Sequence, residues 1–305
     1  MLSLPTKTTG RTTAITGWKR AGSKNKIFKL DTGESDTMGK AAMLSVEELG
    51  EKLAEAGRLK LRPLCVYGTD ELPEGAVPSY TVDRCVAKAV YTAALFEEIP
   101  SIYIEASHEQ CCPGGMVWMG LAEPHPKLKY FVTVGTPDFR GGAAEHLKAT
   151  PELFDEQKER AGKITPPGKY TVIVPCTDYI APETVRSFIL FAGSEQIRNL
   201  CGLAQFSNSD PFFRTIIPGG PTCALMLAFP AGMAENAPED SAFVGPIDPT
   251  GNPWLPPELM VMGIPSALAQ QMAADLEKSF ICKRSRIAYP ENRVVIKPRG
   301  KDIQK

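Results

Sequence analysis

The chain has 305 residues, of which 43% are hydrophobic and 23% charged, and its net charge is −1. This composition is typical of a soluble globular protein with one large or two modest domains, and it excludes collagen-like and wholly disordered chains. No apolar run reaches the roughly 18 residues of a membrane span, and the first residues contain no apolar segment of the secretory type. We therefore expect a cytoplasmic protein that does not enter a membrane.

Basic residues are concentrated at the two ends of the chain. Residues 1–43 hold eight Lys and Arg against three acids, and residues 283–305 hold eight against two, so the segment between them has a net charge of −12. Such basic arms either wrap an acidic body, their own or that of a neighbouring subunit, or touch nucleic acid. Because the basic residues are scattered, we expect a homo-oligomer joined through its arms rather than nucleic-acid binding.

The first predicted helix covers 45–56, where Ser45 and Glu48 form a capping box and Gly57 ends the apolar stripe. The elements expected next in the first half are a strand Leu61–Tyr67, a helix 81–97, a strand Ile102–Ala106, a helix Met116–Leu121, a strand Tyr130–Val134 and a charged helical segment 141–168 that ends in a Thr-Pro-Pro-Gly linker.

The second half repeats this alternation of strands and helices. Its expected elements are a strand Tyr170–Val174, a strand Arg186–Phe191, a helix capped by Ser194, a strand Arg214–Ile217, an apolar helix that runs to Phe229, a strand Leu259–Met262 and a final helix capped by Ser266. The Pro-, Gly- and Asp-rich stretch 230–257 is predicted to be a loop.

Two short motifs occur once in each half in the same order. Thr69-Asp70 and Thr177-Asp178 follow strands, and Pro-Gly-Gly at 113–115 and 218–220 precedes apolar helices. This pattern favours an α/β fold of two similar halves, an internal repeat about a pseudo-twofold axis, with mixed sheets covered by helices. The alternative is that both motifs are common turn sequences.

The predicted organisation follows from these halves and from the charge distribution. It comprises a basic N-terminal arm 1–43, a first α/β half 44–164, a second α/β half 165–282 and a basic C-terminal tail 283–305.

The segment Ser107–Met116 carries the clearest chemical signal. Gly114 and Gly115 let backbone N–H groups at a helix start face an anion, so they are candidate cofactor-binding residues. A cysteine at such a helix end has its thiolate stabilised, which singles out Cys112, whereas Cys111 is expected to point into the core. His108 is the histidine closest to these thiols and is the candidate base.

A second glycine turn, Pro218-Gly-Gly-Pro-Thr-Cys223, also lies between a strand and a helix. If the halves are related, Gly219 and Gly220 face the first turn and Cys223 approaches Cys112. Cys85, which follows Arg84 at a helix start, supplies a third thiol with a lowered pKa.

Three interpretations of these residues stay open. In the leading hypothesis Cys112, Cys223 and Cys85 hold an iron–sulfur cluster or another metal cofactor in a redox role, beside a site for an anionic small molecule. In the second, Cys112 is the nucleophile and His108 the base of a thiol enzyme. In the third, the protein is a non-catalytic assembly subunit that works through its arms, and the cysteines are ordinary buried residues.

Several common sites are absent from the sequence. It contains no Cys-x-x-Cys, no zinc-finger spacing, no Walker A motif, no dinucleotide-binding glycine fingerprint and no Gly-x-Ser-x-Gly elbow. Eight cysteines in a chain of this length and compartment do not suggest a disulfide framework.

A wider set of motifs comprises Arg84-Cys85, Cys112-Pro-Gly-Gly with Met119-Gly-Leu, Gln196-Ile-Arg, Gly219-Gly-Pro-Thr-Cys and Pro257-Glu-Leu-Met-Val-Met-Gly-Ile-Pro. Over residues 58–285 this set resembles domain of unknown function 169, also called uncharacterised ArCR, a family mostly of anaerobic bacteria and archaea. The resemblance implies no settled activity. Members often carry a further cysteine in a late Gly-Cys-x-Gly-like loop, which Val244–Asp248 lacks here, and this departure counts against a four-cysteine cluster.

Overall fold

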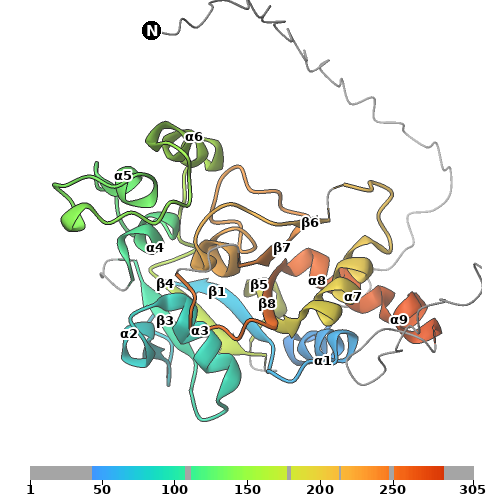
Figure 1. Cartoon of the computed structure of the whole chain (residues 1–305). Helices are drawn as coiled ribbons and strands as arrows, with labels where there is room; N and C mark the ends of the chain where they lie inside the picture. Colours follow the sequence, from blue (N-terminus) through green and yellow to red (C-terminus); the bar gives the residue numbers. More distant parts are fainter. Residues whose placement is uncertain (1–42, 107–110, 177–179, 213, 247–250, 285–305) are drawn as a thin grey trace, which may run out of the picture. The chain divides into compact units, whose positions relative to one another are not determined.

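The computed structural model describes residues 43–106, 111–176, 180–212, 214–246 and 251–284. Within these ranges, eight strands form one mixed sheet in the order β2-β3-β4-β1-β5-β8-β7-β6 (Figure 1). The strands are β1 (Leu64–Thr69), β2 (Val77–Pro78), β3 (Ile102–Glu105), β4 (Tyr170–Pro175), β5 (Val185–Gly193), β6 (Thr215–Ile216), β7 (Ala242–Gly245) and β8 (Leu259–Pro265).

Strands β1 and β5 form the antiparallel pair at the centre of the sheet. Outward from this pair the strands join in the same way on both sides: two antiparallel pairings and then one parallel pairing at each edge. Successive side chains of a strand point to opposite faces. Leu64 and Val66 therefore enter the core on one face, while Cys65 between them enters the core on the other.

One face of the sheet is covered by helices that pack on one another. These are α1 (Val46–Gly57), α7 (Ser194–Gln205) and α8 (Ser266–Asp275), followed by η4 (Leu276–Lys278) and α9 (Phe280–Lys283). The capping box of α1 is as predicted: Glu48 N–H donates to Ser45 Oγ at 3.1 Å, and Ser45 N–H donates to Glu48 Oε2 at 2.9 Å. Buried Gln196 ties α7 to α1 because its amide donates to the carbonyl of Gly57 at 2.8 Å.

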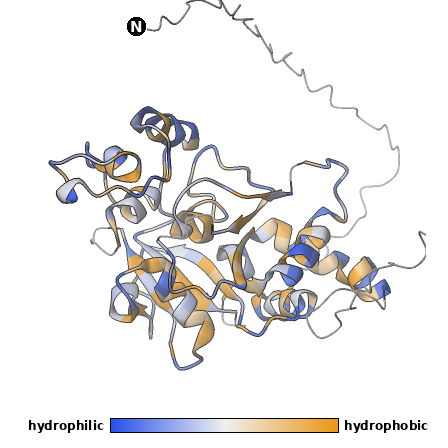
Figure 2. Cartoon of the chain, viewed as in Figure 1, coloured by the Kyte–Doolittle hydropathy of each residue, from blue (hydrophilic) through white to orange (hydrophobic). Residues whose placement is uncertain are grey.

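The other face carries the second core and the cysteine-bearing turns. It is covered by α3 (Val86–Leu95), the short α4 (Pro113–Trp118) and a five-residue π-helix, η3 (Ala224–Ala228), which is buried along its whole length. In Figure 2 the hydrophobic colour is strong on the strands, on α3 and on η3, whereas α6 (Pro151–Ala161) is mostly hydrophilic. The remaining elements are α2 (Ser79–Val82), α5 (Leu128–Val132), η1 (Arg140–Gly142) and η2 (Pro182–Thr184).

Several predicted elements differ from the observed ones. The expected helix 81–97 is divided into α2 and α3, because Asp83 and Cys85 adopt extended backbone conformations. The expected strand Tyr130–Val134 is wrong: Leu128–Val132 forms α5. The charged segment 141–168 is helical over α6, and the predicted loop 230–257 contains strand β7.

The mixed sheets expected for two similar halves are one mixed sheet among the described residues. The strands that were expected to be equivalent, β1 and β4, lie side by side in the single sheet. The fold is therefore mixed α/β, and no internal repeat is shown. Thr177-Asp178 and most of the two basic arms lie outside the described residues.

Among the helices of the described ranges, none combines the length and apolar character that crossing a bilayer requires.

Candidate functional site

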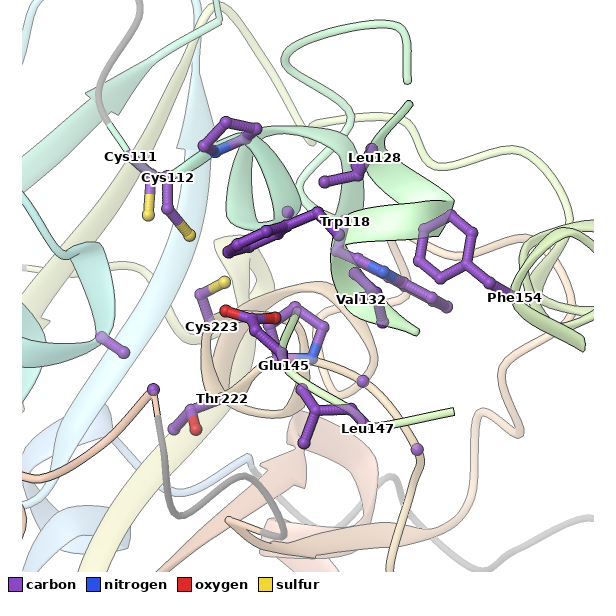
Figure 3. Close-up of a pocket in the computed structure, with 18 of the residues that line it drawn as sticks. Cys111, Cys112, Trp118, Leu128, Val132, Glu145, Leu147, Phe154, Thr222 and Cys223 are labelled. Atoms are coloured by element: carbon purple, nitrogen blue, oxygen red, sulfur yellow. The ribbon is translucent and has the colours of Figure 1, made fainter. Parts of the chain in front are cut away.

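A cavity of about 210 Å³ lies where the two glycine turns meet (Figure 3). Four cysteines line it: Cys85, Cys111, Cys112 and Cys223. Figure 3 shows the sulfur atoms of Cys111, Cys112 and Cys223 directed toward one another. The chain thus brings together thiols from three segments that are far apart in sequence.

Cys85 is held at the beginning of α3, where it is the N-cap residue. Its N–H donates to Oδ1 of Asp83 at 2.8 Å, and the other carboxylate oxygen of Asp83 pairs with Lys88 Nζ at 2.7 Å. Burial opposes ionisation of Asp83, but these hydrogen bonds from Lys88 and Cys85 lower its pKa overall. The ionised carboxylate therefore fixes the backbone that carries the Cys85 thiol.

Cys112 is the N-cap residue of α4, and Pro113 occupies the first helical position, where its missing N–H costs no hydrogen bond. The N–H of Gly115 donates to Cys112 Sγ with an N···S distance of 3.4 Å. Cys112 is exposed, Cys85 and Cys111 are half-buried, and Cys223 is buried next to η3. The site therefore joins an exposed cysteine residue to one that is shielded from water.

Gly115 makes the close approach of the sulfurs possible. A Cβ atom at this position would lie 2.7 Å from Cys111 Sγ and 3.2 Å from Cys223 Sγ. Carbon and sulfur atoms cannot approach so closely without displacement. The space beside the Gly115 backbone is therefore occupied by sulfur from both glycine turns.

Cys111 is the centre of the thiol group. It is hydrogen-bonded to Cys112, Cys223 and Cys85, and these contacts together with burial raise its pKa. The same hydrogen bonds lower the pKa of Cys112 to about 6 and the pKa of Cys85 to about 7. The Gly115 N–H and the charge of Arg140 lower the pKa of Cys112 further. At neutral pH, protonated Cys111 thus lies beside Cys112, whose lowered pKa favours the thiolate.

An apolar wall forms another part of the cavity. It consists of Trp118, Leu128, Phe131, Val132, Leu147 and Phe154, from α4, α5, α6 and the segment between α5 and α6. Trp118 is 3% exposed, and its ring packs edge-on against Phe229 with a centroid distance of 5.9 Å. The Lys158 ammonium lies 4.6 Å from the Trp118 ring centroid. These contacts fix the indole that borders the thiols.

Charged and polar groups also line the cavity. The Arg140 guanidinium lies 4.6 Å from the Phe131 ring centroid, and the Arg140 backbone has the left-handed φ of 49° that is uncommon outside glycine. Glu145 and Lys148 come from the same loop, and Gln157 comes from α6. The Oγ1 atom of Thr222, which is 4% exposed, has no hydrogen-bond partner among the described residues.

Most of the predicted site residues meet at this cavity. Cys85, Cys112 and Cys223 line it, as do Gly114, Gly219 and Gly220, and Gly115 lies against its sulfurs. His108 lies outside the described residues. Cys111 packs against the core as expected, but its thiol also contacts the other three.

Among the described residues, no three His, Cys, Asp or Glu side chains are arranged to hold one metal ion. The metal role assigned to Cys85, Cys112 and Cys223 therefore stays a prediction. The sequence interpretation also missed Arg140, Glu145, Lys148 and Thr222, because no local pattern marks them.

The other cysteines lie away from the cavity. Cys65 is fully buried on the opposite face of the sheet, where its hydrogen bond with Cys176 and its burial raise its pKa well above the ordinary value. Cys201 packs against the same core, and Cys282 is exposed on α9. These thiols serve as references for the reactivity of the cavity cysteines.

Comparison with known proteins gives one match. The family model described as DUF169, uncharacterised ArCR, matches residues 52–275. No curated protein and no solved structure matches the chain.

Proposed function

Because the chain belongs to the DUF169 family of uncharacterised ArCR proteins, we propose its function from the geometry of the site: the four cysteines hold an iron–sulfur cluster, or a related thiophilic metal cofactor, in a redox role. The observation that carries the proposal is the grouping of Cys85, Cys112 and Cys223 around Cys111 at one cavity.

The proton balance of this group supports a bound cation. Cys111 has one thiol proton, which it can donate to one neighbour at a time, yet it contacts three sulfurs. Two of those sulfurs have lowered pKa values and are largely thiolates above pH 7. Clustered negative charge in a partly buried site is costly unless a cation compensates it. A soft metal centre compensates it best, because thiolates are its preferred ligands.

A cluster suits the site better than a single ion. The described residues contain no group that converges on one metal ion. In an iron–sulfur cluster the thiolates bind different iron atoms, so their sulfurs need not meet at one point. Cys111 supplies a fourth thiol in place of the late-loop cysteine that Val244–Asp248 lacks.

The cavity beside the sulfurs supports a redox role over a purely structural one. Structural metal sites are enclosed by their ligands, whereas reactive sites keep access for another molecule. Here Cys112 is exposed, and aromatic and charged side chains extend the cavity away from the thiols. When bound, a cluster would supply electron transfer to a molecule held in this space.

Anaerobic purification followed by iron and sulfide analysis and visible absorbance tests the proposal. We expect iron and sulfide in the wild-type protein and loss of both in Cys111→Ser and Cys223→Ser. The control is Cys282→Ser, whose exposed thiol is remote from the cavity and whose loss leaves the metal content unchanged. Metal-free wild-type protein, after reconstitution with iron and sulfide has also failed, would contradict the proposal.

One observation favours a second function, that of a thiol enzyme with Cys112 as nucleophile. Cys112 is exposed, and its pKa is lowered to about 6. Because the thiolate is the reactive form, iodoacetamide should modify Cys112 at pH 6.5 much faster than Cys282. Equal rates at the two positions would exclude this function.

A further inference from the structure

Beside the sulfurs, the cavity contains a corner formed by Lys148, Gln157 and Gly219, and Thr222 of the same turn also lines the cavity. We propose that this corner binds the carboxylate of a small organic acid with an apolar or aromatic body. The inference deepens the proposed function by naming the class of ligand that the cofactor site would serve, and it rests on that function only for the ligand's role.

Lys148 and Gln157 lie together at the second glycine turn. The point where a Cβ atom on Gly219 would lie is 2.6 Å from Gln157 Nε2 and 3.5 Å from Lys148 Nζ. An ammonium group and an amide donor thus flank the same piece of backbone. Two neighbouring donors of this kind match the two oxygens of a carboxylate.

Lys148 is available to a ligand. Among the described residues, no carboxylate forms an ion pair with it, although it is half-buried. The other cation at the cavity, Arg140, stacks on Phe131. Among the described residues, Lys148 is therefore the cation of the cavity that has neither an aromatic ring nor a carboxylate as a partner.

Thr222 gives independent support. Its hydroxyl oxygen is buried and has no hydrogen-bond partner among the described residues, while other atoms of Thr222 line the cavity. A buried hydroxyl without a partner costs free energy, and native proteins tolerate it where a ligand or water completes the hydrogen bond. Rotation of the Thr222 side chain about its Cα–Cβ bond would turn the hydroxyl toward a ligand oxygen in the cavity.

The rest of the cavity limits the ligand's size and charge. The volume of about 210 Å³ is smaller than the roughly 300–1,000 Å³ of a drug-sized site. The wall of Trp118, Phe131 and Phe154 suits an apolar or aromatic body. One ammonium with neutral donors matches a single negative charge better than a phosphate dianion.

Calorimetric titration with benzoate, benzamide and inorganic phosphate tests this inference. We expect benzoate to bind the wild-type protein, benzamide to bind at least about tenfold more weakly, and phosphate not to compete. Lys148→Gln should weaken benzoate binding about tenfold or more. The matched control, Lys60→Gln, removes an exposed lysine outside the cavity and should leave binding unchanged.

Thr222→Val keeps the test decisive if Lys148→Gln fails to fold. Valine has nearly the shape of threonine but no hydroxyl, so the variant should keep or raise the melting temperature while benzoate binds more weakly. Equal binding of benzoate and benzamide, competition by phosphate, or unchanged affinity in both variants would overturn the inference. So would an absence of benzoate binding to the wild-type protein.

Iron analysis of the same samples separates the two proposals. Iron-containing protein that does not bind benzoate overturns the carboxylate site and leaves the cofactor proposal intact. Iron-free protein that binds benzoate, and that cannot be reconstituted, supports the carboxylate site and overturns the cofactor proposal.

Discussion

Gly115 shows how much of the site depends on a missing side chain. The sulfurs of Cys111 and Cys223 occupy the space into which any other residue would project. Its neighbour Gly114 has nothing within 4 Å of the corresponding position, although both glycines belong to α4. The two adjacent glycines of this motif thus occupy different surroundings, since sulfur fills the space at Gly115 and no atom does so at Gly114.

We therefore predict that Gly115→Ala separates the sulfurs and abolishes cofactor binding. The added methyl group must displace at least one thiol, but alanine gains about 0.5–1 kcal/mol in a helix over glycine, so global stability should change little. Gly114→Ala is the matched comparison, because its methyl group meets no sulfur and should reduce the iron content less. Iron content and the midpoint of urea denaturation check both variants, and normal iron content in Gly115→Ala would contradict this role.

The sequence was sufficient to predict that Cys85, Cys112 and Cys223 approach one another, because each lies beside a helix start or a glycine turn. It was not sufficient to place Cys111, since the directions of adjacent side chains depend on the backbone angles of the turn. Lys148, Gln157 and Thr222 become neighbours through tertiary packing, which no local pattern reports.

Among the secondary-structure elements, the start of α3 matters most for the site, because it carries Cys85. Asp83 accepts the Cys85 N–H and pairs with Lys88, one turn further along the chain. The interaction holds both the helix start and the thiol. Its strength should follow the ionisation of Asp83.

We predict that Asp83→Ala lowers the free energy of unfolding by about 1 kcal/mol at pH 7. Asp83→Asn should cost less, because an amide oxygen still accepts the Cys85 N–H. The folded-state pKa of Asp83 is lowered, so its contribution is complete above the unfolded-state pKa and disappears as pH falls through the folded-state value. The free energies of unfolding of wild type and Asp83→Ala, measured by urea denaturation, should therefore converge in acid.

The reference variant is Asp138→Ala. Asp138 pairs with Lys127 at 3.6 Å, but its side chain is 76% exposed, so its loss should have little effect. A pH-independent difference between wild type and Asp83→Ala would show that the carboxylate charge is not what stabilises α3.

Helix α5 shows why one element was predicted wrongly. Tyr130–Val134 is rich in aromatic and β-branched residues, which favour strands. However, Leu128, Phe131 and Val132 have helical spacing and pack together with Phe154 of α6. Tertiary packing against α6 thus outweighed local propensity. Strand β7 was missed because it is short and lies within a stretch rich in Pro and Gly.

At the scale of the whole molecule, the central pair β1–β5 joins the two parts of the chain. Leu64 and Ile189 are partners in this pair, and both are fully buried. The strand and helix patterns were largely predictable because they depend on local hydrophobic periodicity. The single sheet was not, because strand order depends on contacts between segments more than a hundred residues apart in the case of β1 and β4.

We predict one cooperative unfolding transition for the described residues. Leu64→Ala should lower the free energy of unfolding by roughly 2–5 kcal/mol and shift the whole transition. Leu72→Ala, at a position 61% exposed, should stay within about 0.5 kcal/mol of wild type. Far-ultraviolet circular dichroism and tryptophan fluorescence should give the same midpoint, and two separate transitions would instead indicate independently folding halves.

The thiol cavity depends on both parts of the chain being in place. Cys85 and Cys112 precede strand β4, whereas Cys223 follows β6 and is held by a helix that packs on β7 and β8. A ribosome-bound chain that has emerged only as far as β5 therefore has an incomplete set of sulfurs. Any inorganic centre that the four sulfurs hold must be inserted after synthesis has passed η3, and its delivery is a step of maturation rather than of early folding.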